Sequence, residues 1–296
     1  MTLSYHEPVL TSEVLDALRV TPGKKYIDGT VGGGGHSVEI LKRGGILLGI
    51  DTDGEAVEHT KEEFRIRNKE LRIKDNWKII QGNFRDIEAI AKENGFSEVA
   101  GILFDLGVSS HQLDTPERGF SYRFASAPLD LRLNQGSGET AAQLVHRASE
   151  EQLYEIFATF GEEERAGAIA RAIVRARSVN PVRLTADLVR IIESAGIAKS
   201  EVSGVSSRIF QALRIAVNDE LSALEEAIAG ARRLLVSGGR LAIISFHSLE
   251  DRIVKRKMKE TGWSVISRKP ITASPNETEK NRRSRSAKLR IAEKHE

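Results

Sequence analysis

The feature that most constrains the fold of this chain is a run of four consecutive glycines, Gly32–Gly35, within the stretch DGTVGGGGHS. Glycine loses more conformational freedom on ordering than any other residue, so four in a row favour neither a helix nor a strand. The run instead predicts a sharp turn between a strand at Lys25–Thr30 and a helix at His36–Arg43. A continuously apolar run, Gly45–Asp51, predicts a buried strand after that helix. Together they predict a strand–helix–strand unit of a parallel sheet.

The same alternation continues along the next part of the chain. It predicts a helix at Glu55–Lys69, a strand at Lys78–Gly82, a helix at Ile87–Asn94 and a strand at Val99–Gly107. From about Leu113 the strand-like runs disappear. The chain then shows only helix-like stretches, at Thr140–Arg147, Glu150–Phe160, Glu163–Ala176 and Thr185–Ala195. This change predicts an all-helical insertion in an α/β fold.

After the insertion the mixed pattern resumes. Apolar residues recur at steps of three and four from Phe210 to Leu235, which predicts one long helix. A strand at Arg240–Phe246, a capping box at Ser248–Asp251 and an antiparallel pair, Trp263–Arg268 with Lys288–Ala292, are expected to follow. We therefore predict a core formed by residues 1–112 and 205–296, with residues 113–204 as the helical insertion.

Composition excludes several classes of protein. The chain has no cysteine, which excludes a disulfide framework and a thiolate metal site. No secretory leader pattern is visible, and no apolar run approaches the ~20 residues of a membrane span, so we expect a cytoplasmic protein without a membrane partner. The net charge of +2 is uneven, because the segment from Arg252 onward carries 14 Lys and Arg against 5 Asp and Glu. This basic end indicates a polyanionic partner, although a solvated tail would have the same composition.

Three kinds of nucleotide-binding loop compete for the glycine run. A phosphate loop requires Lys-Ser/Thr after its last glycine, and here Gly35-His36 follows Gly34 instead. A dinucleotide fingerprint requires a third Gly or Ala, where this chain has Ser37 or Val38. An S-adenosylmethionine loop has an acid followed by small residues at alternate positions. Asp28, Thr30, Gly32 and Gly34 follow that pattern, with Thr30 in place of the first glycine.

Further anchors for such a cofactor fall at the carboxyl ends of the predicted strands. Asp51 lies 19 residues after Gly32, where an acid can accept both ribose hydroxyls, and Phe84 follows the third strand, where an aromatic ring can stack on adenine. Asp105 ends the fourth strand. Taken singly, Asp51 is compatible with a turn and Phe84 with the core, but ligands of open parallel sheets bind at this edge. The histidines have no metal-ligand spacing, so we expect no metal site.

Several longer motifs resemble the bacterial 16S rRNA cytosine-N4 methyltransferase family (RsmH, also called MraW). The residues that carry the resemblance are Tyr26–Thr30, Gly34–Ser37, Asp105–Ser110, Arg118–Ser121, Phe210–Leu221, Ser245–Asp251, Arg283–Arg290 and the segment HEPVL at 6–10. The resemblance implies a Rossmann-like class I S-adenosylmethionine-dependent methyltransferase with an inserted helical domain that helps to hold RNA. Its substrate would be a cytosine N4 amine in the decoding centre of 16S rRNA. The partner that the resemblance implies is this rRNA within the small ribosomal subunit.

The family's cofactor contacts, carried over by motif, fall on Gly34, Gly35, His36, Asp51, Phe84, Asp105 and Gln112. For catalysis we expect Asp105, or backbone carbonyls of the turn that it begins, to orient the amine, with Ser109 and His247 as helpers. The alternative for His247 is a structural role beside the adjacent capping box. One departure is Val205-Ser-Ser-Arg208, where the family usually has Pro-Ala-Thr-Arg. The sequence leaves open whether the chain is a monomer or a homodimer.

Two other functions compete with this interpretation. A non-catalytic ribosome-assembly factor on the same fold should have lost the acid or glycine anchors, which are intact here. A DNA amino-methyltransferase should show an Asp/Asn-Pro-Pro-aromatic turn, which the stretch Asp105–Ser110 lacks. On the insertion, Arg171, Arg175 and Arg177 are candidate RNA contacts, and the alternative for them is an ordinary solvated helix face.

Overall fold

The computed structural model describes residues 8–71 and 76–295, and for residues 67–71 only the backbone. The chain divides into two compact units. The core unit comprises the residues up to Ser109 and those from Leu221 onward, and the helical unit comprises Ser110–Glu220. The sequence had placed these divisions after residues 112 and 204.

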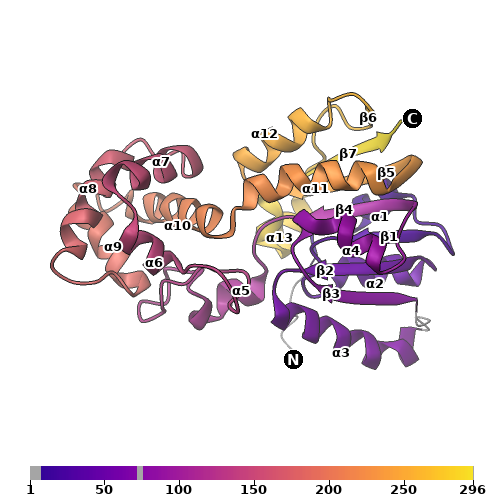
Figure 1. Ribbon diagram of the computed structural model, residues 1–296, viewed down its shortest axis with the longest axis horizontal. Coiled ribbons are helices and arrows are strands. Elements are labelled where there is room, and N and C mark those ends of the chain that lie inside the picture. Colours follow the sequence, from indigo (N-terminus) through magenta and orange to yellow (C-terminus); the bar gives the residue numbers. More distant parts are fainter. Residues whose placement is uncertain (1–7, 72–75, 296) are drawn as a thin grey trace. The chain divides into compact units, whose positions relative to one another are not determined.

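The core unit is built on a seven-stranded sheet with the order β3-β2-β1-β4-β5-β7-β6 (Figure 1). The strands are β1 (Lys25–Asp28), β2 (Ile46–Asp51), β3 (Trp77–Gln81), β4 (Val99–Asp105), β5 (Leu235–Ser245), β6 (Trp263–Val265) and β7 (Lys288–Lys294). The first five run parallel, and β7 pairs antiparallel with both β5 and β6. The predicted α/β fold and its terminal antiparallel pair are therefore confirmed. The strand order reverses beside β1, which makes the edge beyond β1 and β4 the expected ligand crevice.

Helices cover both faces of this sheet (Figure 1). On one face lie α1 (Thr11–Leu18), α2 (Gly35–Lys42) and α3 (Gly54–Leu71), whose Leu15, Leu41 and Phe64 belong to one buried apolar cluster. On the other lie α4 (Ile87–Glu93), α11 (Glu220–Leu234) and α12 (Ser248–Lys257), with Ile87 and Leu224 in a second cluster. Short elements complete the unit: η1 (Phe84–Asp86), α13 (Pro275–Lys280) and η3 (Arg282–Ser286).

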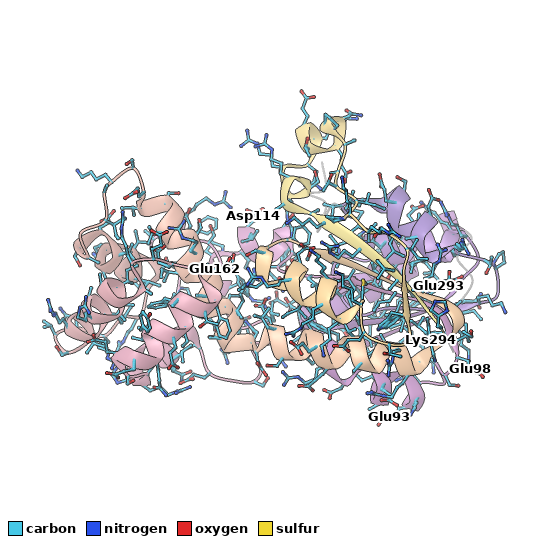
Figure 2. The ribbon with its side chains drawn as sticks, turned by 90° about the horizontal axis from the view of Figure 1, so that it is seen from above. Glu93, Glu98, Asp114, Glu162, Glu293 and Lys294 are labelled. Carbon is cyan, nitrogen blue, oxygen red and sulfur yellow. The ribbon has the colours of Figure 1, made fainter. Side chains whose placement is uncertain are left out.

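The strands β5 and β7 are joined by side chains as well as by their ladder. The Arg240 Nε donates to Glu293 Oε2 at 3.0 Å, and the Lys294 Nζ donates to the Leu235 carbonyl at 2.6 Å. Glu293 and Lys294 are labelled on β7 in Figure 2. These contacts secure the last strand within the sheet. In the described part of the chain, no helix combines the length and hydropathy that a bilayer crossing requires.

The helical unit contains α5 (Ser110–Asp114), η2 (Pro116–Arg118), α6 (Ala141–Arg147), α7 (Glu150–Phe160), α8 (Ala166–Arg177), α9 (Thr185–Ser194) and α10 (Val202–Asn218). The start of α7 follows from a capping box, in which the Ser149 hydroxyl accepts from the Gln152 N–H and the Gln152 side chain accepts from the Ser149 N–H. Apolar residues of α7, α8 and α10, such as Phe157, Ile169 and Leu213, are fully buried. The four helices expected in this region are thus present.

The prediction of a single long helix from Phe210 to Leu235 is wrong. The chain forms two helices, α10 and α11, because Asp219 takes a left-handed backbone conformation with φ of 48°. Aspartate tolerates this conformation better than most residues. The apolar stripe cannot reveal the break, since a one-residue interruption leaves the spacing of three and four almost unchanged.

A candidate cofactor site at the strand ends

Three acids lie together at one edge of the sheet because each is the last residue of a parallel strand. Asp28 ends β1, Asp51 ends β2 and Asp105 ends β4, and β1 pairs with both of the other strands. The sequence expectation that these side chains share the carboxyl edge is thus met by the strand order.

The glycine loop is anchored by its own backbone. The Gly29 N–H donates to the Leu103 carbonyl of β4 at 2.9 Å, and the Val31 N–H donates to the Ile50 carbonyl of β2 at 2.9 Å. From α3, the Thr60 hydroxyl donates to the Gly32 carbonyl at 2.6 Å. The loop is therefore held from both neighbouring strands and from a helix.

The glycines of this loop are required by backbone conformation and by contacts within the chain. Gly32 and Gly34 have φ of +49° and +78°, which disfavour other residues. A Cβ on Gly34 would lie 2.8 Å from a ring carbon of Phe64, and one on Gly35 would lie 2.7 Å from Cγ of Pro8. At Gly34 and Gly35 the missing side chain thus makes room for the protein's own residues. The backbone groups of both glycines remain candidate contacts for a cofactor.

Asp28 ties the loop to the helix that follows it. Its carboxylate accepts from the Ser37 hydroxyl at 2.7 Å and from the Thr30 N–H at 3.2 Å. Burial raises the pKa of Asp28, and the neighbouring His36 opposes that rise. These two hydrogen bonds join the end of β1 to the loop and to α2, so Asp28 shapes the loop.

Asp51 is placed to accept hydrogen bonds from a ligand. Its Oδ2 accepts from the Gly32 N–H at 2.8 Å and its Oδ1 from the Asp53 N–H at 2.9 Å, which fixes the carboxylate plane. Burial raises the pKa of Asp51 to about 6, against the effect of these two N–H groups. A carboxylate oxygen can accept more than one hydrogen bond, so each oxygen retains capacity for a ribose hydroxyl.

His36 is held in one tautomer and faces Asp105. Its Nε2 lies 2.9 Å from the Val9 carbonyl oxygen, and because a carbonyl only accepts, Nε2 carries the proton. The other nitrogen, Nδ1, lies 3.8 Å from Oδ2 of Asp105. The Asp105 N–H donates to the Thr30 hydroxyl at 2.6 Å. The glycine loop therefore holds the backbone of Asp105, and the His36 ring of α2 lies beside its carboxylate.

Phe84 presents an aromatic ring after β3. The ring packs against Phe104 with centroids 5.6 Å apart and planes inclined at 42°, and the residue is only partly buried. The Asn83 side chain accepts from the Arg85 N–H at 2.9 Å and so begins the short helix η1. A half-exposed ring fixed from behind suits stacking with a flat heterocycle.

The turn after β4 is secured by a residue that sequence reasoning did not single out. The Arg283 guanidinium of η3 donates to the Val108 carbonyl, and it lies over the Phe246 ring at 5.9 Å. Ser109 ends this turn. No local pattern could have revealed the contact, because its partners lie far apart in the sequence and Arg283 is one of several arginines in a basic segment.

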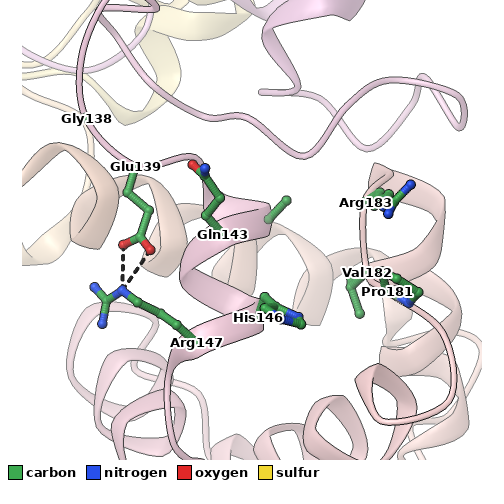
Figure 3. Close-up of a pocket in the computed structure, with 9 residues that line it drawn as sticks. Gly138, Glu139, Gln143, His146, Arg147, Pro181, Val182 and Arg183 are labelled. Atoms are coloured by element: carbon green, nitrogen blue, oxygen red, sulfur yellow. Dashed lines mark hydrogen bonds and ion pairs between the residues drawn. The ribbon is translucent and has the colours of Figure 1, made fainter.

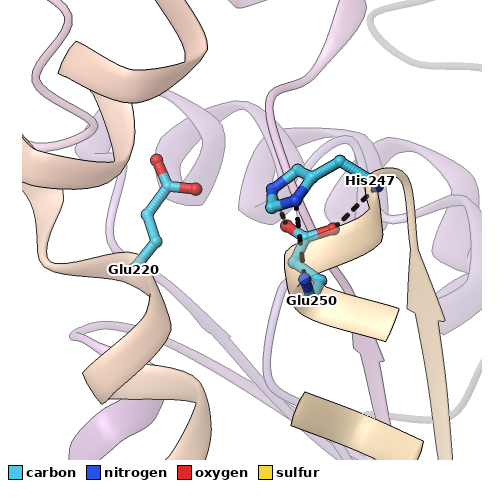
Figure 4. Close-up of side chains that lie close together, drawn as sticks. All are labelled: Glu220, His247 and Glu250. Atoms are coloured by element: carbon cyan, nitrogen blue, oxygen red, sulfur yellow. Dashed lines mark hydrogen bonds and ion pairs between the residues drawn. The ribbon is translucent and has the colours of Figure 1, made fainter. Parts of the chain in front are cut away.

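His247 caps α12. The Glu250 N–H donates weakly to its Nδ1 at 3.5 Å, and Glu250 Oε2 accepts from the Phe246 N–H at 2.8 Å (Figure 4). The predicted capping box began one residue too late, at Ser248, because Ser248 is the first helical residue and His247 is the N-cap. Asp251, the other expected member, instead receives the Arg290 guanidinium at 2.6 Å.

In the helical unit, Gln112 is a buried residue of α5. Two of the candidate RNA-contacting arginines have internal partners. The Arg177 Nη1 donates to the Val145 and Ala148 carbonyls at 2.5 and 2.6 Å, and Arg171 lies 3.8 Å from Glu150. Arg177 therefore joins α8 to the end of α6.

The helical unit also contains a cavity of about 730 Å³ (Figure 3). An ion pair of 2.7 Å between Glu139 and Arg147 lies on one of its walls. The other residues that line it are Gly138, Ala142, Gln143, His146, Pro181, Val182 and Arg183.

The residues at the strand ends fit S-adenosylmethionine. Asp51 has an oriented carboxylate for two vicinal hydroxyls, Phe84 offers an aromatic face for adenine, and Asp105 adds negative charge for the cationic end of the molecule. The loop that starts α2 brings backbone groups to the same edge.

Comparisons with known proteins show the family to which the chain belongs. The chain matches the MraW methylase family over residues 3–295. It is 44% identical to "Ribosomal RNA small subunit methyltransferase H" of Heliobacterium mobile, covering 98% of this chain and 99% of that protein. It is 46% identical to the protein of the same name from Deinococcus deserti, covering 98% and 93%. The chain belongs to the MraW methylase family, and is a Rossmann-like, S-adenosylmethionine-dependent methyltransferase.

Proposed function

We propose that this protein methylates the N4 amine of a specific cytosine in the decoding centre of 16S rRNA. The observation that carries the proposal is the identity of 44–46%, over almost the whole chain, to proteins named for methylation of small-subunit rRNA. The motifs that resemble the cytosine-N4 family support the choice of the amine. On this proposal the enzyme acts in the cytoplasm, where its partner is the small ribosomal subunit.

The chemistry requires orientation more than activation. Bound S-adenosylmethionine supplies an electrophilic methyl group on a sulfonium. The N4 amine of cytosine is a weak nucleophile because its lone pair is delocalised into the ring. The protein must therefore hold the amine in line and accept a hydrogen bond from it.

We assign that task to Asp105. It ends β4 at the ligand edge of the sheet, where its Oδ2 lies 3.8 Å from Nδ1 of His36. The Asp105 carboxylate can accept from an amine N–H and take the proton after methyl transfer. Ser109, at the end of the same turn, is a second candidate for contact with the base.

His247 is better suited to positioning than to proton transfer. Its Nδ1 accepts from the Glu250 N–H, and its Nε2 lies 3.1 Å from Glu250 Oε1. Both ring nitrogens thus face groups of the helix that it caps. Among the proposed cofactor contacts, Gly34, Gly35, His36, Asp51, Phe84 and Asp105 lie in the core unit and Gln112 in the helical unit.

The direct test supplies labelled methyl donor and small ribosomal subunits from a strain that lacks the enzyme. We expect label in 16S rRNA, and mass spectrometry of nuclease fragments should place it on the N4 of one cytosine. Label on another base, on N3 or C5 of cytosine, or only on DNA or protein would contradict the proposal. Naked 16S rRNA, tested in parallel, shows whether the assembled subunit is the substrate.

A further inference from the structure

A groove of about 380 Å³ lies between α12 and the edge of the sheet formed by β6 and β7, within the core unit. Its charged lining is entirely cationic: Lys255 from α12, Lys259 just after that helix, Arg268 after β6 and Arg290 from β7. Met258 and Val265 supply apolar surface between these cations. No acidic residue lines the groove in the described part of the chain.

The basic residues at the end of α12 and just after it form two groups, one paired with acids and one lining the groove. Arg256 and Lys257 face acids, since Arg256 pairs with Glu225, and Lys257 lies 3.4 Å from Glu225 and 3.1 Å from Glu260. Lys255 lies in the last turn of α12 and Lys259 two residues after its end, and both line the groove. Among residues 8–71 and 76–295, no acid lies within ion-pair distance of Lys255, Lys259 or Arg268.

The remaining cation of the groove is only partly neutralised. Arg290 holds the carboxylate of Asp251 through two bonds of 2.6 and 3.2 Å, and Lys288 lies 3.8 Å from the same carboxylate. The charge of Lys255 also acts on this carboxylate, so one negative charge faces three positive ones. The groove as a whole therefore has a strong excess of positive charge around an apolar strip.

The apolar strip distinguishes this groove from an ordinary solvated basic face. Met258 is almost fully buried, whereas Val265 is 37% exposed and the adjacent Ile266 is 43% exposed. Val265, the last residue of the edge strand β6, lies in the groove beside lysines and offers a surface for a flat apolar group whose substituents are anionic. A nucleotide in a single strand has that combination, a base next to a phosphodiester.

We propose that this groove binds single-stranded RNA, with the phosphodiester held by Lys255, Lys259 and Arg268 and a base over Val265. The proposal rests on the proposed function, which makes RNA the substrate. The groove is then a binding site for the substrate strand outside the cofactor site. It favours RNA over an acidic peptide because peptide carboxylates have no flat apolar group for the Val265 surface.

The test measures binding of a fluorescent single-stranded RNA at several salt concentrations. We expect Lys255→Gln/Lys259→Gln to weaken binding about three- to tenfold and to lower the slope of log K against log salt by about 1.4, since each phosphate contact on a single strand contributes about 0.7. A matched double variant, Lys24→Gln/Arg65→Gln, removes two exposed charges elsewhere in the core unit. It should bind RNA with the affinity and the salt slope of the wild type. Val265→Ser should weaken binding about twofold without changing the slope.

Two outcomes overturn the proposal. In the first, the groove variant binds RNA as the matched control does. In the second, polyglutamate displaces RNA as well as a competing RNA does, which would make the groove a general anion or acidic-peptide site. Unchanged affinity for S-adenosylhomocysteine in every variant shows that each has folded.

Methyl transfer to small subunits separates this proposal from the proposed function. If the wild type methylates 16S rRNA and the groove variant has the same KM for small subunits as the wild type, the groove proposal fails and the function stands. If the wild type transfers no methyl group to rRNA, the function fails, and the direct binding measurement still decides whether the groove holds RNA.

Discussion

At the scale of single residues, the carboxylate of Asp51 is subject to two opposed demands. Hydrogen bonding to ribose hydroxyls favours its ionised form, whereas burial raises its pKa from 3.8 to about 6. A raised pKa in the folded state favours the protonated form, so its contribution to stability is full below pH 3.8 and is lost as the pH rises through 6.

The Asp51→Asn variant isolates this effect because all other titrating groups are shared. Between pH 4.5 and 7.5 the wild type should lose ~2 kcal/mol of unfolding free energy relative to the variant. Urea unfolding at each pH, without cofactor, provides the measurement. A difference between the two proteins that does not change with pH would show that Asp51 has an ordinary pKa.

Asp105 provides the second prediction at this scale. Asp105→Asn keeps the shape of the side chain but cannot accept a proton, so kcat should fall at least a hundredfold while affinity for S-adenosylhomocysteine changes only severalfold. Single-turnover transfer and calorimetric binding measure the two quantities. Normal turnover with intact binding would show that Asp105 does not accept the proton.

Gly35 provides the third prediction at the scale of single residues. A Cβ at this position would lie 2.7 Å from Pro8, so Gly35→Ala should destabilise the protein by about 1–3 kcal/mol. Adding Pro8→Ala removes the two nearest atoms, Cγ and Cδ, and should recover part of that loss in a double-mutant cycle of unfolding free energies. If the glycine instead served only to leave space for the cofactor, Gly35→Ala would leave the stability of the cofactor-free protein unchanged and weaken binding alone.

At the scale of elements, the turn after β4 depends on a segment from the far end of the chain. Arg283, in η3, donates to the Val108 carbonyl and covers the ring of Phe246, which begins the loop after β5. Two of the loops at the ligand edge are therefore held by one guanidinium. Its planar shape allows both contacts at once, which an ammonium does not allow equally well.

Replacing Arg283 should thus affect catalysis more than cofactor binding. We expect Arg283→Ala to lower kcat about tenfold, with an affinity for S-adenosylhomocysteine within threefold of wild type. The kcat of Arg283→Lys should lie between those of Arg283→Ala and the wild type, because lysine can still donate to Val108. Steady-state kinetics on small subunits and calorimetry supply the readings. Equal loss in the Lys and Ala variants would locate the effect in the stacked contact instead.

At the scale of the whole molecule, the two compact units should respond differently to cofactor. The anchors at Asp51, Phe84 and Asp105 all belong to the core unit, so S-adenosylhomocysteine should slow amide exchange in the glycine loop and at the ends of β2 and β4. Amides of α7, α8 and α9 should exchange at unchanged rates. Hydrogen–deuterium exchange with mass spectrometry tests this, and equal protection throughout both units would contradict it.

How far the sequence predicts this molecule depends on the range of each interaction. The strands and the acids at their ends follow from local alternation, which is why Asp51 and Asp105 could be placed on one edge. The break at Asp219 and the cap at His247 depend on single backbone conformations that hydrophobic spacing does not record. The contacts of Gly35 with Pro8 and of Arg283 with Val108 join distant segments, and no local pattern contains them.

The position of β7 has a consequence for the order in which the chain folds during synthesis. The strand lies between β5 and β6, so β6 has no partner in the sheet until residues 288–294 have been made. The helical unit is continuous in sequence, and all its residues emerge from the ribosome before β5 does. The helical unit can therefore fold while the ribosome is still making the end of the core unit. During that interval β5 has a long exposed edge.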